Sequence, residues 1–137
     1  MGGMDDSKET ITLNCLVLGD HPEDDVFPVT IATHKTIGEL KKLIAEENPE
    51  TFSEIEAKKL ELWQVQIPAA YGVKNESMDA LRGAADTFSQ SGSIDNSLIQ
   101  SQLGGQYLPP LNDINECWAE DPLKKHIHVL IERPAGK

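Results

Sequence analysis

The sequence contains little cysteine, no long apolar run and no apolar leader. Its two cysteines, Cys15 and Cys117, allow at most one internal disulfide. We expect both thiols to be reduced, because Cys15 lies in an apolar run, where a free thiol behaves as a small hydrophobe. No apolar run approaches the roughly 20 residues of a membrane-spanning helix. Met1–Thr10 is polar and acidic, so we expect either an intracellular chain or one whose export signal was removed or is unconventional.

Basic residues are also scarce. The chain has 12 Lys and Arg against 23 Asp and Glu, which gives a formal net charge of −11. Because an acidic surface repels phosphate groups, we expect no direct nucleic-acid binding and no binding to an anionic membrane. The length of 137 residues, with 39% hydrophobic and 26% charged residues, is typical of one soluble domain with one core.

Two β-rich segments open the chain and predict a hairpin. Ile11–Leu18 alternates apolar and polar residues, and Val26–Ala32 follows after the polar turn Gly19–Asp25. Pro28 cannot donate a ladder hydrogen bond, so the second segment is predicted to be an edge strand or to contain a bulge.

The clearest local signal is a helix start. Thr36-Ile-Gly-Glu39 has the residues of a capping box, in which the Thr hydroxyl and the Glu carboxylate bond each other's backbone amides. Apolar residues then recur at helical spacing and predict one buried stripe, formed by Ile37, Leu40, Leu43 and Ile44. Asn48-Pro49 is predicted to end the helix.

The second half of the chain is predicted to be less regular. Leu60–Ile67 alternates like a strand, and His126–Glu132 is a second strand. Between them we expect a long irregular insertion over about 69–107, with a helical turn at Met78–Arg82 and one short helix over Ile94–Leu103. Asn112 or Asp113 is predicted to cap a further short helix through Trp118.

These elements predict an α+β fold of the ubiquitin-like β-grasp type, a mixed sheet with one main helix. In that fold the last strand lies mid-sheet, parallel to the first, and the most apolar strands are expected there. We expect a tail at 1–10, the domain at 11–134 and a tail at 135–137. Three apolar sets are expected to face the helix: Leu13/Cys15/Val17, Phe27/Val29/Ile31 and Ile127/Val129/Ile131.

No set of residues predicts catalysis or a cofactor. His126 and His128 are two apart on a strand, which could supply half a zinc site, but no further ligands are placed nearby, so we expect no metal. Gly104-Gly105 has no preceding strand and no following Gly-Lys-Ser/Thr, so it is not a phosphate loop. The cysteines have no evident histidine partner.

One constellation suggests protein binding. If Leu60 and Leu62 face the helix, the other face of the sheet carries apolar side chains with histidines at their edge. This composition is typical of a protein-binding surface. The residues of this predicted surface are Trp63, Val65, His128, Leu130, Leu16 and Leu18. Histidines would make that surface sensitive to pH. The alternative is that the insertion folds back and covers the patch as a second core.

Four segments in this order resemble the N-terminal header domain of Crinkler effectors, proteins of oomycetes and fungi: Ile11–Gly19, Thr36–Ile44, Ala57–Trp63 and His126–Pro134. In that family the N-terminal domain has a ubiquitin-like fold. The family's Leu-Phe-Leu-Ala-Lys motif falls where this chain has Leu62-Trp-Gln-Val-Gln66, which puts the motif's translocation role in question here. The variant is more similar to the fungal branch.

The resemblance implies a non-catalytic N-terminal domain for trafficking and protein interaction, secreted and delivered to a host cell, including its nucleus. Its expected partners are proteins, among them a second copy bound through the open sheet face. In the family, effector domains follow this N-terminal domain; none follows Pro134, so we expect an isolated N-terminal domain. One alternative is a ubiquitin-like modifier or adaptor inside the producing cell, and another is a small enzyme. A modifier needs a Gly-Gly end, which Ala135-Gly-Lys137 lacks.

Overall fold

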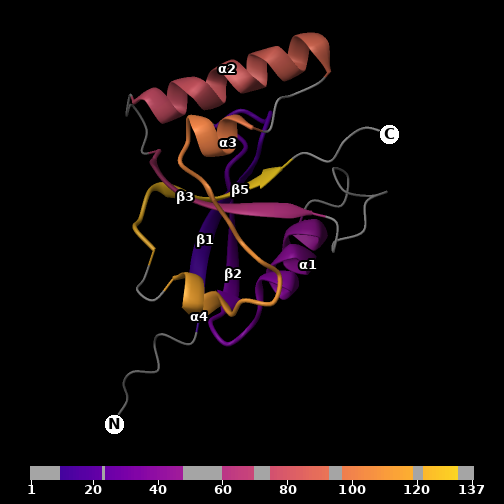
Figure 1. Ribbon diagram of the computed structural model, residues 1–137, viewed down its shortest axis with the longest axis vertical. Helices are drawn as coiled ribbons and strands as arrows, with labels where there is room; N and C mark the ends of the chain where they lie inside the picture. The colour runs from indigo at the N-terminus through magenta and orange to yellow at the C-terminus, as the bar shows by residue number, and fades with distance from the viewer. Residues whose placement is uncertain are drawn as a thin grey trace.

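The two N-terminal strands form the predicted hairpin. β1 (Thr10–Val17) and β2 (Phe27–Ala32) pair antiparallel, with Ile11 opposite Ile31. Figure 1 shows the computed structural model, which describes residues 10–22, 24–47, 60–69, 75–92, 97–118 and 122–132. Pro28 lies in β2 at the edge of the sheet, where a missing backbone donor is tolerated, as predicted.

The remaining strands complete the predicted mixed sheet. They are β3 (Glu61–Pro68), β4 (Gln106–Tyr107) and β5 (His126–Glu132), and the strand order is β2-β1-β5-β3-β4. β5 runs parallel to β1, with Cys15 opposite Val129, and antiparallel to β3. The last strand therefore lies mid-sheet beside the first, and the predicted α+β fold of β-grasp type is confirmed.

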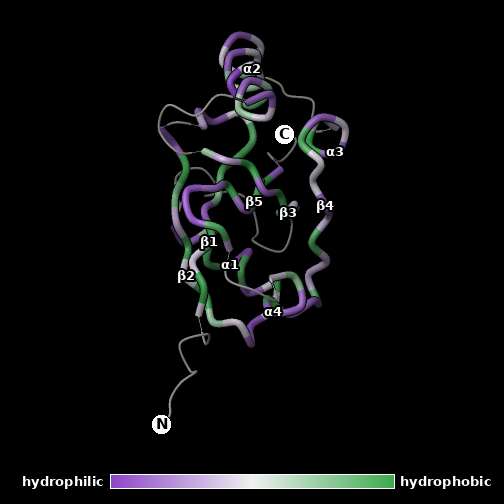
Figure 2. Tube along the Cα trace, turned by 90° about the vertical axis from the view of Figure 1, so that its left-hand side faces the viewer, coloured by the Kyte–Doolittle hydropathy of each residue, from purple (hydrophilic) through white to green (hydrophobic). Residues whose placement is uncertain are grey.

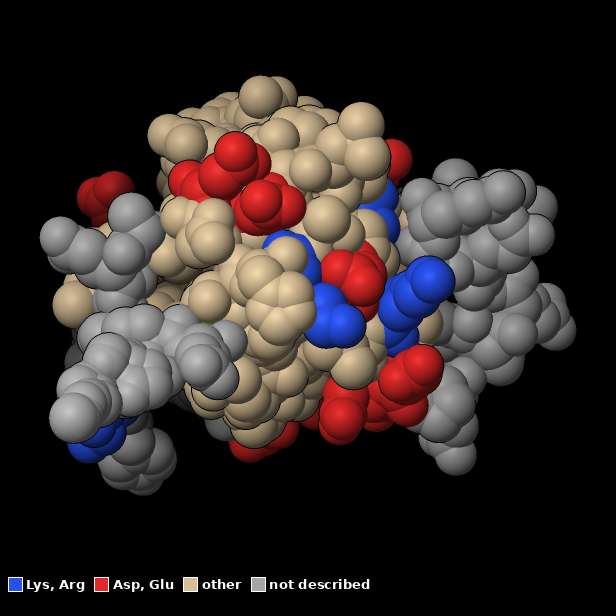
Figure 3. Space-filling view, turned by 90° about the horizontal axis from the view of Figure 1, so that it is seen from below, with Lys and Arg blue, Asp and Glu red and all other residues tan. Residues whose placement is uncertain are grey.

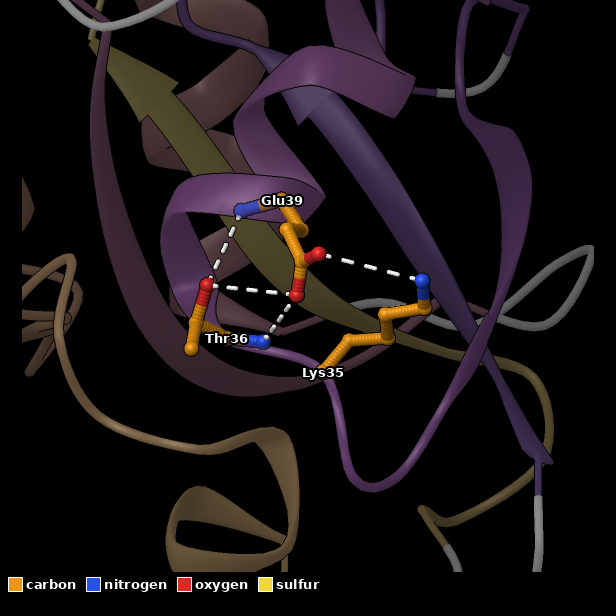
Figure 4. A network of polar contacts seen from close by, with 3 residues as sticks. All are labelled: Lys35, Thr36 and Glu39. Atoms are coloured by element: carbon orange, nitrogen blue, oxygen red, sulfur yellow. Dashed lines mark hydrogen bonds and ion pairs between the residues drawn. The ribbon is translucent and has the colours of Figure 1, made fainter.

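Helix α1 (Ile37–Glu47) begins at the predicted capping box. The Glu39 amide donates to Thr36 Oγ1 at 3.2 Å, and the Thr36 amide donates to Glu39 Oε1 at 3.0 Å. Figure 4 shows both bonds together with Lys35, whose Nζ lies 3.7 Å from Glu39 Oε2. These bonds hold the pKa of Glu39 below its usual range. The helix ends at Glu47, and the predicted stop at Asn48-Pro49 lies outside the described residues.

A first core fills the space between α1 and the sheet. It contains the predicted helix stripe, with Leu43 partly buried, and the predicted faces of β1 and β2, together with Leu60, Leu62, Val129 and Ile131. Helix α4 (Ile114–Cys117) closes this core with Ile114 and Trp118. Its start is stabilised by the Asp113 amide, which donates to Glu116 Oε1 at 3.0 Å; the predicted short helix is therefore present.

The insertion is more regular than predicted. Helix α2 (Glu76–Ser91) has 16 residues, where the sequence predicted only a turn over Met78–Arg82. Asn75 Oδ1 caps the helix by accepting from the Met78 amide at 2.8 Å, and Gly92 ends it in the left-handed conformation, φ 77°. Helix α3 (Leu98–Ser101) is the predicted short helix, with fewer residues. Figure 1 shows α2 and α3 together at one end, above the strands.

A second core lies between these two helices and the opposite face of the sheet. Met78 and Leu81 of α2 and Ile99 of α3 pack against the sheet; the sheet residues are Leu16, Leu18, Val65, Ile67, Ile127 and Leu130. In Figure 2 hydrophobic and hydrophilic residues alternate along the strands, and α2 also mixes both kinds of residue. Ile127 was predicted to face α1 but packs in this second core. The pairing of β3 with β5 shifts register between Gln64 and Ile67, which turns the start of β5 towards α2.

Gly104 and Gly105 allow α3 to approach the sheet closely. Gly104 has φ 68°, and the Gly105 amide donates to the Ile99 carbonyl at 2.8 Å. A Cβ at position 105 would lie 2.5 Å from Ile99 Cγ2 and 3.4 Å from Trp63 Cβ. A side chain at this position would therefore push α3 away from β3.

Three further predictions concern the cysteines, the chain ends and membrane-spanning helices. Both thiols are free, with Cys15 buried and Cys117 half-buried. Thr10, assigned to the tail, is the first residue of β1, while 1–9 and 133–137 lie outside the described residues. Among the described residues no helix has the length and apolarity needed to cross a bilayer.

The second core generates a stability prediction. Ile99 is fully buried, so Ile99→Ala should lower the free energy of unfolding by about 2–5 kcal/mol, because it leaves a cavity under α3. Leu111 is 89% exposed, and Leu111→Ala should change that free energy by less than about 0.5 kcal/mol. Urea denaturation measures both. Equal stability of the two variants would mean that α3 does not pack on the sheet.

Candidate interaction surface

The sheet face that was predicted to be open is covered. Leu16, Leu18 and Leu130 have no exposed surface, Val65 is 6% exposed and His128 is 4% exposed. Only Trp63 remains half-buried. The prediction that these residues form an open face is wrong, because residues of α2 and α3 pack against that face. The alternative, an insertion folded back as a second core, is confirmed. Self-association itself stays a prediction.

His128 has a structural role in place of the predicted surface role. Its Nδ1 accepts from the Asn14 amide at 2.9 Å, so the proton lies on Nε2, which donates to the Leu123 carbonyl at 2.6 Å. Asn14 also donates from its side chain to the His126 carbonyl at 2.8 Å. Neutral His128 therefore connects β1 to the segment that leads into β5.

A surface cleft lies beside this histidine. Its volume is about 840 Å³, within the size range of ligand sites. Its lining residues come from β3, from β4 and its flanks, from α4 and from the segment before β5. Its lining includes Gln64, Gln66, Gln106, Tyr107, Trp118 and Leu123. No sequence pattern indicated that these residues share one surface.

The cleft is held together by contacts between distant segments. Gln64 Nε2 donates to the Cys117 carbonyl at 2.8 Å, which ties β3 to α4. At the rim, the ring of Tyr107 packs edge-on against Trp63 with 5.5 Å between centroids. Trp63 Nε1 in turn donates to Glu132 Oε1 at 3.1 Å. Tyr107 is 44% exposed and Leu123 is 50% exposed, so the rim presents apolar surface to solvent.

Carboxylates border the cleft at two places. The pKa of Tyr107 is raised, first by its hydrogen bond to Glu61, then by burial and by the charges of Glu61 and Glu132. Burial raises the pKa of the Cys117 thiol, and the charges of Glu116 and Asp113 raise it further, against a hydrogen bond from Asn112. Elsewhere, on the face seen in Figure 3, basic side chains lie directly beside acidic ones.

The titratable groups of the cleft are constrained by burial and by hydrogen bonds. A thiol with a raised pKa carries little thiolate, and both nitrogens of His128 are bonded to backbone groups. Among the described residues, no three His, Cys, Asp or Glu side chains are grouped so that they could hold a metal ion. His126 Nδ1 lies 2.8 Å from the Lys124 carbonyl oxygen. Both histidines that could supply half a zinc site therefore contact backbone groups.

A family model described as the N-terminal domain of Crinkler effector proteins matches residues 11–132. The chain belongs to this family. A relative, Crinkler effector protein 1 of Rhizophagus irregularis, is 32% identical over 125 residues, which is 91% of this chain and 22% of the relative. The chain therefore spans about a fifth of that Crinkler protein's length. No solved structure matches the chain.

The Crinkler match includes the insertion. Residues 11–132 contain α2, α3 and the cleft as well as the β-grasp strands. The second helical layer is therefore part of the region that the family model covers. Strand β3, which carries Leu62-Trp-Gln-Val-Gln66, lies between the two cores.

His128 makes stability depend on pH. Burial, first, and the neighbouring His126 lower its pKa below the usual 6.5, against the hydrogen bond to Leu123. The unfolded chain then binds more protons than the folded chain below about pH 6.5. The free energy of unfolding should therefore fall as the pH falls from about 6.5 to the folded-state pKa.

His128→Gln should reduce the stability difference between pH 7.5 and pH 5.0, because the titrating group is gone. The exposed His34 provides a matched control, and His34→Gln should keep the wild-type difference. Thermal unfolding at both pH values measures this. A wild-type pH dependence in His128→Gln would show that protonation of His128 is not coupled to folding.

Proposed function

We propose that this Crinkler N-terminal domain is a non-catalytic module that binds protein partners through the cleft. In the longer effector, this domain would bind a partner that directs the following effector domain to its target. The effector would first be secreted and delivered to a host cell, including the nucleus. Delivery is supported by the family, whose members are effector proteins. The binding role is supported by the surface itself.

The observation that carries the proposal is the cleft with its apolar rim. Half-exposed Tyr107 and Leu123 flank it. Tyrosine is enriched among the residues that dominate binding energy, and Leu123 adds apolar surface of the kind found at the centre of interfaces. The rim is also held in place, because Trp63 supports Tyr107 and His128 supports Leu123. A preformed rim lowers the entropy cost of binding.

The rim residues test this function. The double variant Tyr107→Ala/Leu123→Ala should lose at least about 2 kcal/mol of binding free energy, about thirtyfold in affinity. Proximity labelling with a biotin ligase fused to the chain, in fungal and plant cells, should then lose a defined set of proteins that the wild-type chain labels.

Leu111→Ala is the matched control, since Leu111 is exposed but does not line the cleft. It should label the same proteins as the wild-type chain. Circular dichroism verifies that all variants are folded. An unchanged set of labelled proteins in the double variant would contradict binding through the cleft.

A further inference from the structure

The cleft follows a strand edge that is only partly paired. β3 has eight residues, while β4 has two, which face Trp63 and Gln64. Next to them, the Leu108 amide donates to the Leu62 carbonyl at 3.0 Å. Among the described residues, the pairing on this side of β3 ends at Gln64. The next residues, Val65 and Gln66, line the cleft, so the edge of β3 beyond Gln64 faces an open volume.

The side chains around this edge suit a peptide backbone. Gln64, Gln66, Gln106 and Asn112 line the cleft, and each primary amide both donates and accepts hydrogen bonds, as peptide groups do. An extended peptide beside an incomplete sheet gains main-chain bonds from the strand, and its side chains enter adjacent pockets.

Charge selects among such peptides. The cleft lining contains Glu116 and no Lys or Arg. Glu61 and Glu132 act on Tyr107 at one place, and Glu116 and Asp113 act on Cys117 at another. Lys124 and Lys125 follow Leu123 in an exposed turn and are not part of the lining. With a net charge of −11 on the whole chain, the cleft repels anions and attracts cationic groups.

We propose that the cleft binds an extended peptide that carries Lys or Arg, added as a short strand to the edge of β3 at Gln64–Gln66. Its basic side chains face the carboxylates that border the cleft. This inference rests on the proposed protein-binding function and specifies the chemistry of the partner.

The test is selection from a random twelve-residue phage-displayed library on the folded 137-residue chain. Selected peptides should carry a net positive charge and should bind at least about tenfold more weakly to Glu61→Lys/Glu116→Lys. Glu46→Lys/Glu47→Lys makes the same change of charge on the exposed face of α1 and should keep the wild-type affinity. In amide-resolved NMR titrations, the largest shifts should fall on Gln64–Gln66.

The outcomes separate the two proposals. Peptides that need Tyr107 and Leu123 but have no excess of Lys or Arg would overturn the charge inference and leave protein binding through the cleft standing. Basic peptides that bind equally to both charge-reversed variants would also overturn it. If no selected peptide depends on Tyr107 or Leu123, both the inference and the function of the cleft fail.

Discussion

The end of β1 and most of β5 are apolar on both faces of the sheet, and the rest of the structure follows from that constraint. On β1, Leu13 and Val17 face α1, while Leu16 and the following residue, Leu18, face the other side. Each buried leucine contributes about 1.5–3 kcal/mol relative to exposure. A β-grasp sheet with α1 alone would leave the second set in water, so a second layer over that face is required. Helices α2 and α3 provide it.

The second layer decides where a partner can bind. It removes the apolar end of this sheet face from solvent. The β3 edge stays accessible, because β4 is short. The cleft forms where this edge meets α4, and its walls are tied to the sheet by Gln64 and His128. The same histidine that was expected to make an interface sensitive to pH instead couples the fold to pH, through a bond that only its neutral form makes.

Local signals predicted most of the first core. The capping box at Thr36, the alternation in β1 and the apolar run in β5 each act within a few residues, so the sequence was sufficient. The long helix in the insertion was missed because Gly83 and the Ser residues weaken its helix propensity. Its signals were nonetheless present: Asn75 as a cap, Met78, Leu81 and Ala85 at helical spacing, and Gly92 as a stop.

The cleft could not be predicted in the same way. It depends on contacts between segments that lie far apart in sequence, such as the bond from Gln64 to Cys117. The irregular pairing between Gln64 and Ile67 also redirects Ile127, and no periodic pattern reveals a register shift. The alternation of residues correctly assigned Leu16, Leu18, Val65 and Leu130 to one face, but it could not show what covers that face.

The most direct test of the account is native-state hydrogen exchange in α2, compared with β5. If α2 is the cover of a second core, the amides of Leu81–Ala85 should exchange only through unfolding events nearly as costly as those that expose Val129–Ile131. Exchange of α2 at rates close to those of an unfolded chain, while β5 stays protected, would contradict the account. The face of the sheet would then be open in solution.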